Sequence, residues 1–233
     1  MNRPLGPPVD ATPAPWPSRV TLEGQTVILE PLEESHADAL FPHIGGAANA
    51  WLWDYMFTDV PSSLAEIRSR IARQAQSKDP FFWAIKVKKH AAQGTAEAEV
   101  VGYIAFLAIV PAHRSIEIGH VMYSAALQRT TAATEAIYLL GHYAIRDLGY
   151  RRLEWKCNDL NAASRKAAAR YGFTFEGVFR QHYISKGRNR DTAWFSILDS
   201  EWERGVEAAF EQWLDPGNFD EEGKQKRRLE SFR

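Results

Sequence analysis

Hydrophobic and polar positions recur at two spacings along the chain, and the spacing predicts which segments are strands and which are helices. Apolar runs or alternation at every second position predict strands, at 26–31, 81–87, 100–109, 116–123, 152–157, 173–183 and 191–198. Apolar residues three and four apart predict helices, at 34–41, from 64 onward, at 137–148, at 162–170 and at 202–213.

The order of these elements predicts the fold class. A meander of strands comes first, and strand, helix, strand, helix and strand follow, which is typical of one α+β domain with a mixed sheet. The segment 100–109 is apolar on both faces, so we expect a central strand that is covered on both sides. A polar loop is expected over 88–99. Capping boxes are predicted at Ser63 with Glu66 and at Ser200 with Glu203.

The two ends of the chain differ from its middle in composition. Residues 1–20 contain six prolines, which exclude a helix or a central strand, so we interpret them as an extended arm that is loose or draped over the domain. Residues 21–215 form the predicted domain. Residues 216–233 are rich in charge and are interpreted as a solvated tail rather than as a binding patch.

Composition excludes several classes of function. The 233 residues carry a formal net charge of -1, so no basic field indicates nucleic acid. We find no apolar run long enough to span a bilayer, and we expect no membrane partner. The only cysteine, Cys157, cannot form an internal disulfide, which fits a reducing compartment and a cytoplasmic location. A homodimer is left open.

The segment 124–136 lies between a predicted strand and the clearest predicted helix, and its small residues let a ligand approach the backbone. The amides at a helix start have no intrahelical acceptor and attract anions such as a pyrophosphate. Residues with these features are Gln128, Arg129, Thr130, Thr131, Ala132, Ala133 and Thr134. A helix start of this composition is also common without any ligand.

This segment resembles the CoA-binding loop of the GNAT superfamily of acyl-CoA-dependent N-acetyltransferases, and the chain looks most similar to its ribosomal-protein (RimJ/RimL-like) branch. The family pattern is Gln/Arg-x-x-Gly-x-Gly/Ala. Gln128 and Ala133 match it, while Thr131 stands where glycine is usual. The resemblance covers about residues 20–202. It implies a mostly antiparallel sheet that is flanked by helices and splayed between its fourth and fifth strands.

A second block, Asn161-Ala-Ala-Ser164 followed by Tyr171-Gly-Phe, resembles the segment after the family's fifth strand. By this resemblance Asn161 binds the pantetheine arm, although it is equally interpreted as a helix N-cap. Ser164 would hold or protonate the leaving CoA sulfur. Many family members use a tyrosine where this chain has Ala168, so Tyr171 or Tyr183 are alternatives to Ser164.

The block Ile116-Glu-Ile-Gly-His120 resembles the family's fourth strand, which bulges and admits the acyl arm. Gly119 suits a bulge, and amides near Val121 and Met122 could hold the thioester oxygen. Glu117 lies between apolar residues, and burial would raise its pKa and make it a general base; it could also be a surface carboxylate. His120 is the rival base, and by resemblance a cofactor contact.

Acceptor-binding residues are expected in 42–62, where aromatic side chains accompany a carboxylate that could receive a cationic amine. The predicted residues are Trp51, Trp53, Asp54 and Tyr55. The same cluster is as readily interpreted as a satellite core beneath a loop. The seven histidines are scattered without a zinc-like spacing, so we expect no metal.

The resulting hypothesis is an enzyme that uses acetyl-CoA as co-substrate and transfers the acetyl group directly to a primary amine. Cys157 ends an apolar strand and is interpreted as a buried, inert thiol rather than a covalent nucleophile. The arm and the tail are long enough to cover a groove, which favours a small-molecule acceptor slightly over a protein N-terminus. The alternative is a non-catalytic acyl-CoA-binding module, suggested by Thr131 and Ala168.

Overall fold

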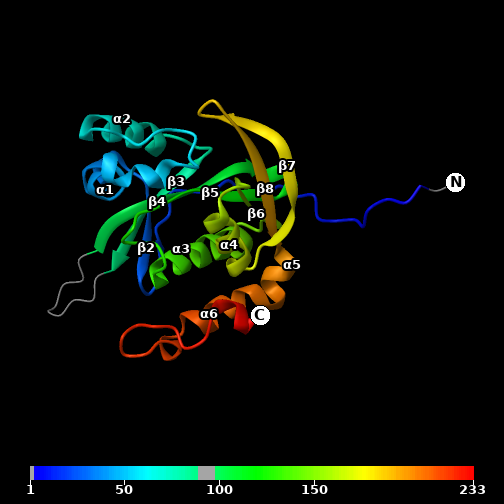
Figure 1. The fold of residues 1–233 in the computed structure, drawn as a ribbon. Helices are drawn as coiled ribbons and strands as arrows, with labels where there is room; N and C mark the ends of the chain where they lie inside the picture. The colour runs from blue at the N-terminus through cyan, green and yellow to red at the C-terminus, as the bar shows by residue number, and fades with distance from the viewer. Residues whose placement is uncertain (1–2, 89–97) are drawn as a thin grey trace.

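One twisted sheet of eight strands organises the computed structural model, which describes residues 3–88 and 98–233 (Figure 1). The strand order is β1-β2-β3-β4-β5-β6-β8-β7, and every neighbouring pair is antiparallel except β5 and β6. The strands are β1 (Leu22–Glu23), β2 (Val27–Pro31), β3 (Phe81–Lys88), β4 (Ala98–Val110), β5 (Ser115–Tyr123), β6 (Arg152–Asn158), β7 (Thr174–Ser185) and β8 (Arg188–Leu198). The predicted mixed, mostly antiparallel α+β fold is confirmed.

Helices cover both faces of the sheet (Figure 1). They are α1 (Ala37–Ile44), α2 (Leu64–Ala75), α3 (Thr131–His142) with a π-helical extension (Tyr143–Asp147), α4 (Ala162–Tyr171), α5 (Asp199–Glu201) with a π-helical extension (Trp202–Val206), and α6 (Glu207–Leu214). Short 3₁₀ turns occur at Glu34–His36, Ala47–Trp53, Pro111–His113, Pro216–Asn218 and Leu229–Phe232. In the strand β4, Ile104 and Phe106 pack with α3 and α6, while Tyr103 and Ala105 pack with α1 and α2. The expected doubly covered central strand is therefore β4.

Local predictions held at some element ends and failed at others. The backbone amide of Glu66 donates to the Ser63 hydroxyl at 3.3 Å, but the Glu66 carboxylate binds the amide of Ser62 instead of completing the box. The box at Ser200 is wrong, because the helix already begins at Asp199 and the Glu201 carboxylate accepts the Leu198 amide. Of the predicted loop 88–99, residues 89–97 lie outside the described residues, and its two ends belong to strands.

The proline-rich arm is partly draped over the domain. The Ala14 amide donates to the Pro111 carbonyl at 3.1 Å, and the Tyr150 hydroxyl donates to the Pro15 carbonyl at 3.2 Å. The segment that precedes these contacts extends away from the domain (Figure 1). The arm is thus fixed by main-chain hydrogen bonds and by an ion pair between Asp10 and Arg114.

The C-terminal tail is docked, so its interpretation as a solvated segment is wrong. Its charged side chains are exposed, but Leu229 is 1% exposed and belongs to the main core. The Arg233 guanidinium donates to the carbonyls of Ala169 and Arg170 at the end of α4. A cation at a helix C-terminus satisfies carbonyls that lack intrahelical donors. The sequence pattern missed this contact because its apolar residues are isolated among charges.

We expect Leu229→Ala to destabilise the protein by about 2–4 kcal/mol, because it empties a buried site in the core. The free energy of unfolding by urea measures this. Leu160 is 75% exposed, and Leu160→Ala is the matched control, with an expected change within about 0.5 kcal/mol. Equal stability of the two variants would show that the tail does not contribute to the core.

Candidate active site

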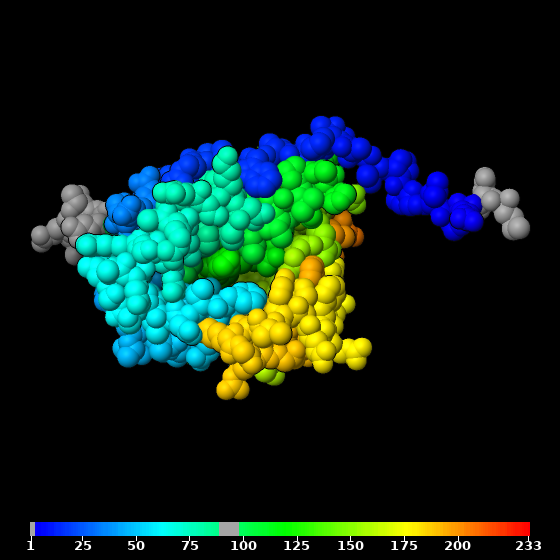
Figure 2. Space-filling view, turned by 90° about the horizontal axis from the view of Figure 1, so that it is seen from above, coloured from blue at the N-terminus to red at the C-terminus, as the bar shows by residue number. Residues whose placement is uncertain are grey.

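The parallel strands β5 and β6 pair over only three residue pairs and then separate. The ladder runs from Ser115 with Arg152 to Glu117 with Glu154. Beyond it, a cavity of about 550 Å³ lies between the strands and is also lined by α2, by the start of α4 and by the segment 52–58. Figure 2 shows the molecule hollowed between the segments coloured cyan and yellow. The predicted splay is therefore where the cavity lies.

A β-bulge in β5 lies beside this cavity. Ala105 of β4 pairs with Gly119 and Tyr103 pairs with Met122, so two residues of β5 oppose the single residue Ile104. His120, the residue after Gly119, adopts a left-handed conformation with a φ of 46°. His120 and Val121 line the cavity, whereas the Met122 side chain is buried in the core. A bulge leaves main-chain groups without ladder partners, and the two bulged residues, His120 and Val121, line the cavity.

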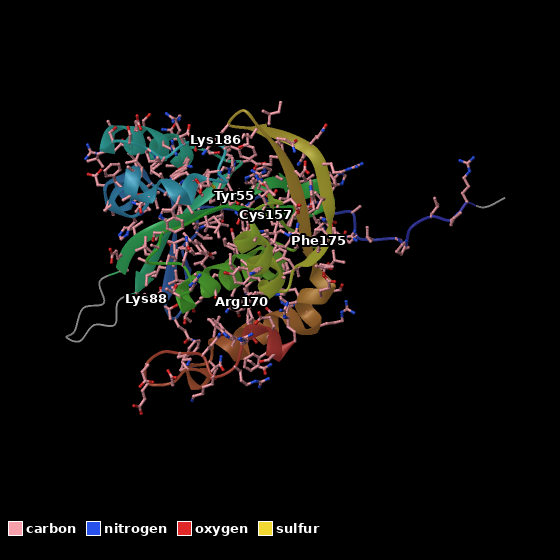
Figure 3. All side chains as sticks on the ribbon, viewed as in Figure 1. Tyr55, Lys88, Cys157, Arg170, Phe175 and Lys186 are labelled. Carbon is pink, nitrogen blue, oxygen red and sulfur yellow. The ribbon has the colours of Figure 1, made fainter. Side chains whose placement is uncertain are left out.

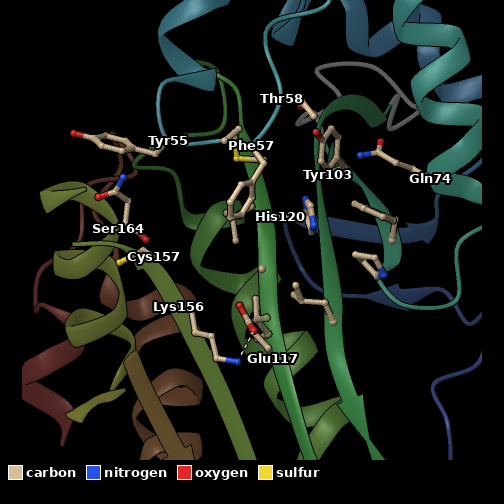
Figure 4. A pocket seen from close by; sticks show the side chains of 18 of the residues that line it. Tyr55, Phe57, Thr58, Gln74, Tyr103, Glu117, His120, Lys156, Cys157 and Ser164 are labelled. Carbon is tan, nitrogen blue, oxygen red and sulfur yellow. Dashed lines mark ion pairs between the residues drawn. The ribbon is translucent and has the colours of Figure 1, made fainter. Parts of the chain in front are cut away.

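Glu117 ends the β5–β6 ladder and reaches the cavity. It is 6% exposed, which rules out a surface carboxylate. Its carboxylate lies 2.9 Å from the Lys156 ammonium, which also lies 2.8 Å from Glu154 and 3.9 Å from the centre of the Trp194 ring (Figure 4). Burial raises the pKa of Glu117, and the shared lysine only partly offsets this. A carboxylate held in this way can accept a proton from a substrate.

Two neighbouring groups are weaker candidates for the base. Burial lowers the pKa of His120, whose ring packs against Phe82, so its neutral imidazole is a weaker base than that of an exposed histidine. Desolvation lowers the pKa of Lys156, but its two carboxylate partners outweigh this and raise the pKa above its ordinary value. Lys156 therefore stays charged.

Ser164 and Cys157 meet on the opposite wall of the cavity (Figure 4). The Trp155 indole donates to the Ser164 hydroxyl oxygen at 3.0 Å, which leaves the hydroxyl proton of Ser164 free to be donated. Burial raises the pKa of the Cys157 thiol, in keeping with an unreactive thiol, although this side chain does line the cavity.

The two tyrosines considered as alternatives to Ser164 do not reach the cavity. Tyr171 is buried and stacks on Phe210, and Tyr183 lies outside against Phe57; neither lines the cavity wall. Asn161 is the N-cap of α4, because its side-chain oxygen accepts the Ser164 amide at 3.0 Å, and it also lines the cavity.

The loop before α3 forms without the glycine that is usual in the family pattern. Arg129 takes the left-handed conformation with a φ of 65°, and Thr131 is an ordinary first residue of the helix. The Thr130 hydroxyl accepts the Ala133 amide at 3.1 Å, and the Gln128 side chain donates to the Tyr123 carbonyl at 2.9 Å. Thr131 therefore does not distort the loop.

The first turn of α3 offers main-chain amides to an anion, although none of residues 128–134 lines the cavity. The amides of Thr131 and Ala132 have no intrahelical acceptor, as at any helix start, and Ala132 and Ala133 have no side chain beyond Cβ. These features fit a phosphate group. Thr134 does not belong to this group, because it is buried and its hydroxyl accepts a hydrogen bond from Arg170. Its cofactor contact stays a prediction.

The model of the acetyltransferase (GNAT) domain matches residues 26–174. This chain belongs to the GNAT acetyltransferase family. A GCN5-related N-acetyltransferase from Brucella melitensis has a crystal structure that is 42% identical, with a TM-score of 0.89 over 96% of this chain and 98% of that one. The uncharacterized N-acetyltransferase YoaA of Bacillus subtilis is 28% identical over 180 residues, covering 76% of this chain and 96% of the relative.

An acetyl transferase from Salmonella typhimurium that modifies the N-terminal serine of ribosomal protein L7/L12 has the same fold. It is 24% identical, with a TM-score of 0.61 over 77% of this chain and 99% of that one. The chain is thus a GNAT N-acetyltransferase, and the RimJ/RimL-like branch stays a prediction.

The acceptor-binding prediction is only partly consistent with the structure of this GNAT protein. Trp53 is 2% exposed, and its indole donates to the Ile44 carbonyl at 2.7 Å, so its predicted substrate contact is wrong and the satellite-core interpretation holds. Trp51 and Asp54 are exposed and do not line the cavity. Tyr55 lines it, and its hydroxyl donates to the Leu160 carbonyl at 3.1 Å.

The tip of the β7–β8 hairpin closes one side of the GNAT cavity. The Lys186 ammonium donates to the Trp53 carbonyl at 2.8 Å, and Lys186 and Tyr55 lie between the hairpin and the helical segments of 47–75 (Figure 3). No residue of the arm or the tail lines the cavity among the described residues. The reason given from the sequence for a small-molecule acceptor is therefore wrong.

Sequence reasoning missed the cationic residues of the site. Arg70, Arg73, Lys156 and Arg190 line the cavity. Lys156 alternates with the apolar Trp155 and Cys157 in β6, which could have signalled a charge turned to the opposite face of the sheet. No sequence pattern indicated that the arginines of α2 line the cavity, because an amphipathic helix normally exposes such residues.

Within residues 3–88 and 98–233, no three His, Cys, Asp or Glu side chains come together in a way that could hold a metal ion. In the same part of the chain, no helix is both long and apolar enough to cross a membrane.

The pKa of Glu117 gives a prediction for stability. Because its folded-state pKa lies above the unfolded value, its contribution to the free energy of unfolding is present at low pH and is lost as pH rises. Wild type should therefore lose melting temperature relative to Glu117→Gln as pH rises above the ordinary pKa of a glutamate and through the higher pKa of the folded protein.

Glu176 provides a control of opposite sign. The hydrogen bonds from Arg152 and Ser196 lower the pKa of Glu176 despite partial burial, so this residue stabilises the protein above its ordinary pKa. Wild type should gain melting temperature relative to Glu176→Gln as pH rises through the acid range. Parallel slopes for the two variants would contradict the buried character of Glu117.

Proposed function

We propose that this GNAT enzyme transfers the acetyl group of acetyl-CoA directly to a primary amine, with Glu117 as the general base. The observation that carries the proposal is the buried Glu117 carboxylate at the point where β5 and β6 part, with a raised pKa and access to the cavity. Glu117, the bulge of β5 and the hydroxyl of Ser164 line the same cavity, so the proposed reaction needs no covalent enzyme intermediate.

The donor side of the proposal rests on three groups of residues. The first-turn amides of α3 and the loop Gln128–Ala133 would hold the pyrophosphate through the backbone. Asn161 would bind the pantetheine arm while it caps α4. The gap beyond Glu117 would admit the acyl end, and His120 and Val121 would line it. Bound acetyl-CoA supplies the activated thioester.

In the proposed mechanism Glu117 accepts a proton from the amine. An alkyl amine has a pKa near ~10 and is mostly protonated at neutral pH, so it must lose a proton before it attacks. A raised carboxyl pKa reduces the difference between the pKa of Glu117 and that of the amine. The proton transfer is therefore less unfavourable. Lys156, which stays charged, would hold the Glu117 carboxylate in place.

The remaining steps use the bulge and Ser164. Main-chain amides near Val121 and Met122 would stabilise the oxyanion that forms when the amine nitrogen bonds to the carbonyl carbon. As the carbon–sulfur bond breaks, Ser164 would donate its hydroxyl proton to the thiolate. The Trp155 indole, which donates to the Ser164 oxygen, would orient that proton.

The acceptor class is proposed from the cavity itself. About 550 Å³ is within the range of small-molecule pockets. We therefore favour a small amine over a protein N-terminus, which the RimJ/RimL-like interpretation would suggest. The alternative of a non-catalytic acyl-CoA module loses one of its two motives, because Thr131 is an ordinary helical residue.

Glu117→Gln should lower kcat/KM by roughly 10²–10⁴-fold and leave acetyl-CoA affinity unchanged, because it removes the base and keeps the shape. In wild type the rate should fall as pH drops below the pKa of Glu117, which lies above that of an ordinary carboxyl. The variant should not show this fall. Steady-state kinetics across pH measure both effects. Unchanged turnover at every pH would remove Glu117 from the mechanism.

Ser164→Ala should lower kcat by roughly 10²-fold or more if Ser164 protonates the thiolate, with little change in KM for acetyl-CoA. The defect should shrink with an acyl donor whose thiol is more acidic, because such a leaving group needs less protonation. An equal defect with both donors would assign the loss to structure instead of proton transfer.

A further inference from the structure

Arg190 of β8 is a buried cation without an anionic partner. It is 8% exposed, and its Nε atom is buried without a hydrogen-bond partner. None of the carboxylates in the described parts of the chain forms an ion pair with it. Burying a charge costs free energy unless it is paired, so such a group is retained only for a reason.

Aromatic rings hold the Arg190 guanidinium in place. It lies 4.4 Å from the centre of the Phe57 ring and 5.8 Å from that of Tyr183. These contacts fix the plane of the guanidinium, but they accept no strong hydrogen bond from its edge. The Nε atom of Arg190 is therefore unsatisfied while two aromatic rings lie near the guanidinium.

Strand alternation puts Arg190 on the same side of the sheet as the proposed base. Lys156 pairs with Trp194 in the antiparallel β6–β8 ladder, and side chains at every second residue of β8 share a face. Arg190 thus shares the face of Trp194 and Lys156, and Lys156 is bonded to Glu117. The opposite face carries Trp155 and Cys157, which pack towards α4.

The cavity as a whole carries more positive than negative charge. Arg70, Arg73, Lys156 and Arg190 line it, and Glu117 is the only carboxylate among the described lining residues. Arg70 and Arg73 bond neutral oxygens of Thr58, Asp59 and Ser69. A bare cationic amine would enter this field against repulsion.

We infer that Arg190 binds a carboxylate of the acceptor, so that the preferred substrate carries an amine and a carboxylate on the same molecule. This inference rests on the proposed function. A planar guanidinium with an open edge suits a carboxylate, which it can bind with two hydrogen bonds. The carboxylate would also compensate the excess positive charge as the substrate enters.

The test uses acceptor pairs that differ only in the carboxylate, with acetyl-CoA as donor. The pairs are phenylalanine with phenethylamine and 6-aminohexanoate with pentylamine. A third pair, the amidated dipeptides Ser-Asp and Ser-Asn, covers a peptide source. Wild type should prefer the acid of at least one pair by roughly 30-fold or more in kcat/KM. Which pair shows the preference distinguishes a small molecule from a peptide.

Arg190→Met should abolish this preference, mainly by raising KM for the acid of the pair. Replacing a buried, unpaired charge by an apolar chain of similar length should not unfold the protein, which thermal melting checks. Arg190→Lys should restore part of the preference. Arg188→Met is the matched control, since Arg188 lies two residues away in β8, is exposed and does not line the cavity.

A preference that survives Arg190→Met, or equal rates for both members of every pair in wild type, would overturn the inference. So would an Arg190-dependent preference for succinyl-CoA over butyryl-CoA, which would put the carboxylate on the donor.

Absence of turnover with every acceptor would count against the proposed function. In that case, calorimetric binding of N-acetylphenylalanine and N-acetylphenethylamine to the CoA complex decides: an Arg190-dependent preference for the acid supports the inference, and equal binding refutes it.

Discussion

The early end of the β5–β6 ladder is the constraint on which the site depends. Three residue pairs join these strands, and then each keeps its other neighbour, β4 or β8, while the two diverge. The sheet therefore stays continuous at one end and opens at the other. The opening exposes main-chain groups in the middle of a covered sheet, where they would otherwise be costly to leave unpaired. A ligand that accepts hydrogen bonds is the natural partner for such groups.

Charge in the opening is arranged around one shared lysine. Lys156 serves two carboxylates, of which Glu154 also binds Arg152 at 2.7 Å, so Glu117 receives only part of the compensation that its burial demands. The charge of Glu117 is only partly compensated by Lys156, so the pKa of Glu117 is raised, but less than it would be without the lysine. The incomplete compensation lowers the stability of the protein. It also gives a base whose pKa is closer to that of the weakly acidic ammonium group of the substrate.

Much of the fold could be predicted from the sequence because periodicity reports burial. The alternation of 81–87, the two-sided apolar run of 100–109 and the stripe of 137–148 each gave the correct element. Conformations that depend on distant partners could not be predicted. His120 and Arg129 take up positive φ angles although neither is glycine, and the Trp53 indole is buried against the Ile44 carbonyl at the end of α1. The lack of a partner for Arg190 is also invisible in sequence, since it depends on every residue that surrounds it.

Strand β6 joins the two halves of the proposed reaction. Its residues alternate, so Trp155 and Cys157 meet Ser164 on the side of α4, while Lys156 meets Glu117 on the side of α2 and the hairpin. A proton taken up at Glu117 and a proton given at Ser164 would therefore act on opposite faces of one opening. Direct transfer is compatible with this separation, because in the tetrahedral intermediate the amine nitrogen and the sulfur are bonded to the same carbon and point in different directions. The parted strands provide it without any moving part.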